Sequence, residues 1–128
     1  MTKLMIGGFL VVHGLVHVAV WATPKGADQP FDPSRSWLLE LFGITAGPAR
    51  TLSIVLTVAA ATGFVAAGVA LFMGIDSWRG MAIASAAGAL PLLLLFFNPW
   101  LTLGVAIELG ILFSLVVSHW PAETVVGA

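Results

Sequence analysis

Four long apolar stretches, separated by short polar segments, constrain the fold of this chain more than any other feature. Among its 128 residues are five basic and six acidic ones, and all but one of these charges lie outside the apolar stretches. Hydrophobic residues make up 59% of the chain and charged residues 9%, whereas a soluble domain carries about 25% charged residues. A water-soluble protein of this size could not bury so much apolar surface, so the sequence predicts an integral membrane protein.

Each apolar stretch is long enough to cross a bilayer as a helix, because a hydrocarbon core about 30 Å thick requires roughly 20 apolar residues. We therefore expect an all-α fold in which an up-down bundle of four transmembrane helices forms a single domain over residues 1–128. The predicted spans cover about residues 4–22, 48–75, 80–97 and 99–119.

Local signals mark where helices begin. Asp32-Pro33 and Asn98-Pro99 each combine a capping side chain with a proline suited to the first helical position. The first pair predicts a short amphipathic helix at the membrane interface, over about residues 33–42. The second pair begins the last span. All five tryptophans fall at predicted helix ends or in the interfacial helix, as expected of a residue that prefers the headgroup region.

The motif HGLVH places His13 and His17 four residues apart, so both imidazoles lie on one face of the first span. Glu108 is the one charged residue in the interior of a predicted span, since Arg50 lies at the start of the second span. At 1.5 Å of rise per residue, His13, His17 and Glu108 lie about 14, 20 and 18 Å from the surface near the termini. The first and last helices of such a bundle are usually neighbours. We expect the three side chains to meet near the midplane, with Thr57 and Thr62 of the second span close to the same layer.

Three interpretations of this polar cluster remain open. In the first, the histidines and the glutamate only hydrogen-bond to one another and hold two helices in register. In the second, His13, His17 and Glu108 bind a transition metal such as zinc, iron or copper. In the third, these residues together with Thr57 and Thr62 form a proton-linked site for a small ligand or ion, since intramembrane ionisable residues often mark such pathways.

Other kinds of site are disfavoured by the residues present. The chain has no cysteine, which excludes disulfides, thiolate metal sites and cysteine nucleophiles. Haem held between two histidines needs them on opposing helices, but His13 and His17 share one helix and His119 lies at the membrane edge. No phosphate-binding loop or matched serine nucleophile stands out, so the sequence favours a protein that is not an enzyme. A net charge of −1 provides no basic patch for nucleic acid.

The segments FLVVHGLVHV and FNPWLTLGVAIELG resemble small bacterial four-helix membrane proteins, and the chain length and the number of spans are similar to those of the DoxX-like group. The resemblance implies a four-helix membrane fold and a location in the bacterial inner membrane, and it assigns no functional residue. The basic residues on the two sides differ by one, which is too few for the positive-inside rule to set the orientation.

The expected function is that of a small membrane protein with a midplane site for a transition metal or a proton-coupled small ligand. The alternative is a non-catalytic accessory or scaffold subunit of a larger membrane complex, in which the polar cluster is purely structural. The lipid bilayer is the expected environment. Small residues at four-residue spacing suit close packing within the bundle or in a homo-oligomer: Ala59, Gly63 and Ala67 in the second span, and Gly80, Ala84 and Gly88 in the third.

Overall fold

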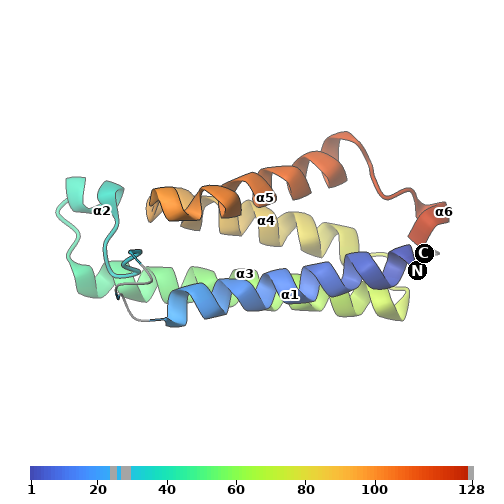
Figure 1. Cartoon of the computed structure of the whole chain (residues 1–128), viewed down its shortest axis with the longest axis horizontal. Coiled ribbons are helices and arrows are strands. Elements are labelled where there is room, and N and C mark those ends of the chain that lie inside the picture. The colour runs from blue at the N-terminus through green and yellow to red at the C-terminus, as the bar shows by residue number, and fades with distance from the viewer. Residues whose placement is uncertain (24–25, 27–29, 127–128) are drawn as a thin grey trace.

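The computed structural model describes residues 1–23, 26 and 30–126, which form helices joined by turns. Four long helical segments run alongside one another in an elongated array (Figure 1). By length and composition, each of the four could cross a membrane. They are α1 (Thr2–Ala22), α3 (Ala46–Met73), α4 (Trp78–Leu95) and the segment Pro99–Val117, whose central part is α5 (Thr102–Leu112).

The last long segment begins as the sequence predicts. Asn98 Oδ1 accepts a hydrogen bond from the backbone N–H of Trp100 at 3.0 Å, and Pro99 starts a 3₁₀ turn that leads into α5. After α5 the chain continues as a π-helical turn over Phe113–Val117. A short helix, α6 (Glu123–Val126), then follows at the end of the molecule where both termini lie (Figure 1).

The connection between α1 and α3 carries α2 (Trp37–Leu41), which begins four residues later than the predicted interfacial helix. Asp32 does not cap this helix. Its Oδ1 accepts from the backbone N–H of Ser34 at 3.0 Å, which closes a local turn. Ser36 caps α2 instead, accepting from Leu39 N, and its hydroxyl donates to a backbone carbonyl at the end of α4.

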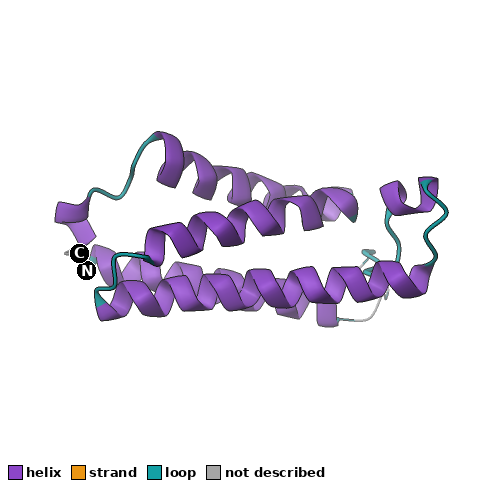
Figure 2. Ribbon diagram, turned by 180° about the vertical axis from the view of Figure 1, so that it is seen from behind, coloured by secondary structure: helices purple, strands orange, loops and turns teal. Residues whose placement is uncertain are grey.

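The long helices pack in the order α1, α3, α4, α5, and direct backbone contact between α1 and α5 is small. Figure 2 shows from behind that the connecting turns gather at the two ends of the array. Along its length, α5 diverges from α1 toward the end that carries the termini (Figure 1). The first and last long helices therefore approach each other mainly through side chains.

Glycine lets α1 and α3 approach closely. A Cβ atom on Gly14 would lie 2.8 Å from the carbonyl oxygen of Ala61, and one on Gly68 would lie 2.7 Å from that of Gly7. Such contacts are typical of helices whose association depends on close packing rather than on hydrophobic burial. The small residues predicted to pack closely on α4 behave differently, because the space beside Gly80 and Gly88 is open.

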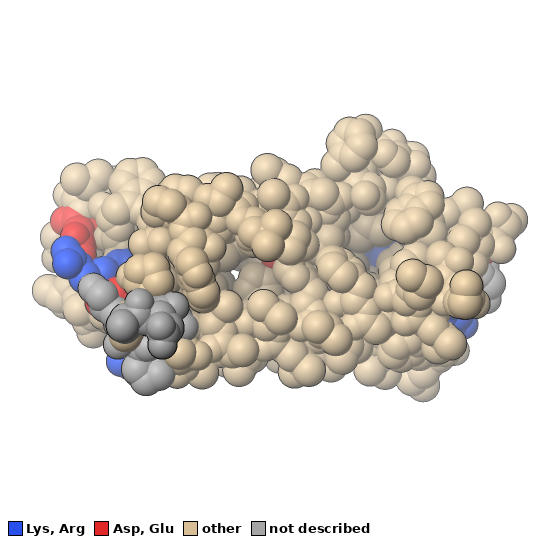
Figure 3. All heavy atoms as spheres, in the orientation of Figure 1, with Lys and Arg blue, Asp and Glu red and all other residues tan. Residues whose placement is uncertain are grey.

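Charge is concentrated away from the middle of the molecule. In Figure 3, most basic and acidic atoms lie toward the ends, and the long central surface is almost entirely uncharged. A small acidic spot is visible within a hollow midway along this face (Figure 3). Glu108 is the one acidic residue of the four long helical segments. This distribution is compatible with a lipid environment around the helices.

Candidate metal centre

His13 and His17 project from one face of α1 toward Glu108 of α5. The Nε2 atom of each imidazole lies 2.8 Å from the same carboxylate oxygen, Glu108 Oε1. All three residues are buried, with exposed fractions of 8% for His13, 5% for His17 and 0% for Glu108. The cluster therefore joins two helices whose backbones otherwise make little contact.

The local sequence explains why both rings point the same way. Four residues separate them, so they occupy successive turns on one face of α1. Between them lies Gly14, whose missing side chain allows α1 to rest against Ala61 and Phe64 of α3. The short distance between α1 and α3 holds the rings against an aromatic side chain from α3.

Aromatic rings surround the two imidazoles. The ring of Phe64, which is completely buried, is parallel to that of His17 at 6.0 Å and edge-on to that of His13 at 4.8 Å. Phe9 stacks on His13 with ring centroids 5.5 Å apart, and the Trp21 ring lies 6.3 Å from that of His17. The four-residue spacing of the α1 rings is visible in the sequence and could have identified Phe9. Nothing in the sequence marks Phe64, whose position depends on how α3 packs.

The shared oxygen sets where the protons lie. An ionised carboxylate only accepts hydrogen bonds, so each imidazole must carry a proton on Nε2 while Glu108 is ionised. With two neutral imidazoles the cluster has one negative charge, and one further proton makes it neutral. Apolar surroundings favour the neutral form, because an uncompensated buried charge is costly. A bound cation is a second way to compensate the same charge.

The other carboxylate oxygen is unsatisfied. Glu108 Oε2 is buried and has no hydrogen-bond partner in the part of the chain that the structure describes. Leaving a buried polar atom unpaired costs about 1 to 3 kcal/mol, and more for a charged group. Coordination of a metal ion would satisfy this oxygen.

The donor atoms are close enough to share one ion. One ligand atom from each of His13, His17 and Glu108 lies within 4.8 Å of the others, so this group could hold a metal ion. In tetrahedral zinc sites, bonds of 2.0 to 2.2 Å place ligand atoms roughly 3.3 to 3.6 Å apart. Small side-chain movements would reach that geometry. Two imidazoles and one carboxylate are typical of zinc and non-haem iron sites that keep a coordination position open.

The two threonines named from the sequence are not part of this group. Thr57 is buried, and its hydroxyl has no partner in the described part of the chain. It lines a separate cavity of about 230 Å³ together with Val18 and Trp21. Thr62 is exposed on α3. The structure therefore brings together His13, His17 and Glu108 and leaves both threonines outside their hydrogen bonds.

No family model, curated protein or solved structure matches the chain. The four long apolar helices are compatible with the architecture of the DoxX-like group, and the comparisons add no further support for that resemblance. Inference about function therefore depends on the buried cluster and its surroundings.

Proposed function

We propose that this chain is an integral membrane protein that binds a divalent transition metal, zinc or iron, at His13, His17 and Glu108. Its four long helices would form an up-down bundle in the bacterial inner membrane, as a single domain with the cluster near the midplane. The length and apolar composition of the helices and the uncharged central surface support this placement.

The observation that carries the proposal is the convergence of three metal-ligand side chains from two helices onto a point where one carboxylate oxygen remains unpaired. A divalent cation would take the place of the Nε2 protons, with each neutral imidazole then carrying its proton on Nδ1, and would compensate the carboxylate charge. It would also give Glu108 Oε2 a partner. Three protein ligands leave a position for water or for an exogenous ligand, which is typical of functional rather than purely structural metal sites.

A second candidate role is structural, in an accessory or scaffold subunit of a larger complex. It is favoured by the fact that the histidine–glutamate hydrogen bonds connect α1 and α5, which have little other direct contact. Proton-linked ligand binding would use the same two Nε2 atoms. Metal binding and proton sharing therefore exclude each other at this cluster.

Metal stoichiometry tests the proposal. Protein purified in detergent would be stripped with a chelator, reloaded with Zn²⁺ or Co²⁺, dialysed, and measured by elemental analysis and by visible absorption of the cobalt form. We expect one ion per chain, and loss of that ion in His17→Ala and Glu108→Gln. Thr62→Ala, which changes an exposed residue of α3, is the matched control and should bind as the wild type does.

Circular dichroism separates loss of the site from loss of the fold. Glu108→Gln is expected to stay folded, because glutamine keeps the size of the side chain and its ability to accept a hydrogen bond. If folded wild-type protein takes up no stoichiometric ion, the metal proposal is wrong. Retention of a full complement of metal by folded Glu108→Gln and His17→Ala would also overturn the proposed ligand set. The structural role would then be the better explanation of the cluster.

A further inference from the structure

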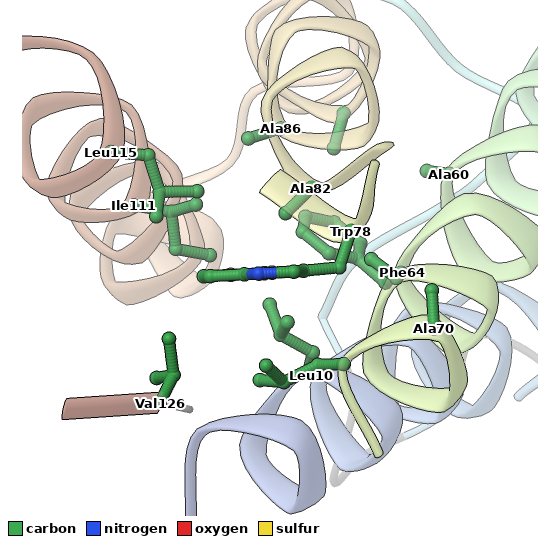
Figure 4. Close-up of a cluster of buried hydrophobic side chains, with 13 residues drawn as sticks. Leu10, Ala60, Phe64, Ala70, Trp78, Ala82, Ala86, Ile111, Leu115 and Val126 are labelled. Carbon is green, nitrogen blue, oxygen red and sulfur yellow. The ribbon is translucent and has the colours of Figure 1, made fainter. Parts of the chain in front are cut away.

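The two ends of the helical array differ in the side chains that lie between the helices. At the end that carries the termini, apolar side chains pack together, and Figure 4 shows Leu10, Trp78 and Ile111 among them. At the opposite end, where α1 ends and α3 begins (Figure 1), these two helices line a cavity of about 230 Å³. The wall of this cavity contains polar residues as well as apolar ones.

Two buried side chains in the wall have polar atoms without a hydrogen-bond partner. They are Trp21, which is 7% exposed, and Thr57, which is 4% exposed. Neither Trp21 Nε1 nor Thr57 Oγ1 has a partner in the described part of the chain. Because an unpaired buried donor is costly, a ligand that accepts a hydrogen bond from both atoms would be stabilised here.

The hydroxyl of Thr57 differs from those of nearby residues in the helices. Thr51 and Ser85 each donate to the backbone carbonyl four residues earlier, at 3.2 and 2.7 Å. Ser53, which lines the same cavity, directs its hydroxyl to backbone carbonyl oxygens at 2.8 and 2.9 Å. Thr57 makes neither kind of bond, so its hydroxyl proton remains available to a ligand.

The indole ring of Trp21 is held in place by other aromatic rings. Its centroid lies 4.8 Å from that of Phe31 and 6.3 Å from that of His17. An indole nitrogen can only donate a hydrogen bond. The partner of Trp21 Nε1 must therefore be an acceptor, and the fixed ring means that little reorganisation is needed to bind it.

A positive charge lines the same cavity. Arg50 contributes to the wall, and its guanidinium forms no ion pair with a described residue. It is exposed, so the side chain can turn toward the cavity, and the helical rise from Arg50 to Thr57 is about 10 Å. Among the described residues, none with a carboxylate lines this cavity. An indole N–H, a hydroxyl and a guanidinium are all donors, and this combination matches an anion.

We propose that this cavity binds a small monovalent anion, either chloride or a short carboxylate such as acetate. The anion would accept hydrogen bonds from Trp21 Nε1 and Thr57 Oγ1, and Arg50 would compensate its charge. Hydrogen bonds to a charged acceptor are about twice as strong as those between neutral groups. The site shares no ligand atom with the proposed metal centre, so it is tested on metal-free protein.

The indole N–H signals test the proposal directly. Metal-free ¹⁵N-labelled protein in a nonionic detergent and sodium sulfate would be titrated with sodium chloride or sodium acetate at constant ionic strength. We expect a saturable downfield shift of the Trp21 indole proton, whose signal is identified by its loss in Trp21→Phe. Trp37 is the internal control: its Nε1 already donates to Leu94 O at 2.8 Å, so its signal should not move.

Substitutions on α3 test the other two donors. Thr57→Val keeps the shape of the side chain and removes the hydroxyl, so it should weaken anion binding by roughly tenfold. Thr62→Val is the matched control, because Thr62 is exposed on the same helix and does not line the cavity. We expect it to bind as the wild type does. Arg50→Gln should also weaken binding, and Arg50→Lys, which keeps the charge, should weaken it less.

Several outcomes would overturn the proposal. A Trp21 signal that does not move, or that moves in proportion to salt without saturating, would mean that the cavity holds water alone. Affinities that are unchanged in both Thr57→Val and Arg50→Gln would place the anion elsewhere. A larger saturable shift on addition of phosphatidylglycerol would identify a lipid head group as the occupant. Saturable binding of either probe supports the proposal, and the ratio of the two affinities distinguishes a halide site from a carboxylate site.

Discussion

His13 and Glu108 are 95 residues apart in the sequence, and the Nε2 atom of the histidine lies 2.8 Å from Oε1 of the glutamate. Together with the equal contact from His17, this hydrogen bond connects α1 to α5 across a region where the two backbones have little contact. The cluster is therefore both the candidate metal site and the main polar link between the first and last long helices. Experiments on it have to separate these two roles.

Energetic coupling between His17 and Glu108 measures the structural role. In metal-free protein, we expect Glu108→Leu to destabilise the fold by about 1 to 3 kcal/mol, because it leaves buried imidazole N–H groups unpaired. A double-mutant cycle with His17→Leu should give a coupling of about 0.6 to 1.7 kcal/mol, the range of hydrogen bonds between membrane helices. Reversible unfolding in mixed micelles provides the measurement. Strictly additive effects would mean that the bond does not link the helices energetically.

Gly14 is expected to be intolerant of even a methyl group. A Cβ at this position would lie 2.8 Å from Ala61 O and 3.0 Å from the Cβ of Phe64, so Gly14→Ala must push α1 away from α3. We expect a loss of about 1 to 3 kcal/mol from this overpacking. Gly8→Ala on the same helix is the matched control, because no atom lies within 4 Å of its new Cβ.

The change in stability of the control variant Gly8→Ala can also be predicted. Alanine is favoured over glycine within a helix by up to about 1 kcal/mol, so Gly8→Ala should leave stability unchanged or increase it. Thermal unfolding of both variants in the same detergent would make the comparison. If Gly14→Ala is as stable as Gly8→Ala, the close approach of α1 and α3 is not required for the fold.

Phe64 is expected to position the imidazoles. Its buried ring contacts both His13 and His17, whereas Phe9 contacts His13 from a position that is 47% exposed. Removing a group that orients metal ligands typically lowers affinity by about 10- to 100-fold. We expect Phe64→Ala to weaken Zn²⁺ binding by about tenfold, and Phe9→Ala to weaken it less. Competition with a chromogenic chelator measures both, and equal affinities in the two variants would contradict this role.

A pH-dependent contact lies outside the long helices, at α2. A hydrogen bond from Arg35, with Nε 3.0 Å from Oε1, is the largest cause that lowers the pKa of Glu40 below its ordinary value. Desolvation opposes this lowering, the positive charge of Arg35 adds to it, and the negative charge of Asp32 opposes it. Because the folded-state pKa is the lower one, the contribution of this pair is present above the ordinary carboxyl pKa. It is lost as the pH falls through the folded-state value.

Substitution of Arg35 tests this contact. We expect Arg35→Gln to raise the pKa of Glu40 toward its ordinary value, as measured by NMR titration of the labelled side-chain carboxyl carbon. The effect on global stability should be small, since both side chains are exposed and solvent screens the pair. An unchanged titration of Glu40 in Arg35→Gln would show that the ion pair does not form in solution.

The sequence by itself determined the features that depend on local chemistry. The lengths of the apolar stretches predicted the four long helices, and Asn98-Pro99 predicted the start of the last one. The rise per residue of a helix placed His13 and His17 at the level of Glu108. These predictions succeed because hydropathy, capping and helical rise are set by residues that are near one another in the chain.

The tertiary structure decided which faces meet. Each of these helices has apolar residues on all of its faces, so no amphipathic pattern distinguishes a buried face from one that faces lipid. For the same reason, the two predicted stripes of small residues had different outcomes: Gly63 of α3 lies against Ser85 of α4, whereas Gly80 lies beside open space. The placement of Phe64 against both imidazoles follows from the packing order of the helices. That order depends on shape complementarity between distant segments, which a single sequence does not encode in any local pattern.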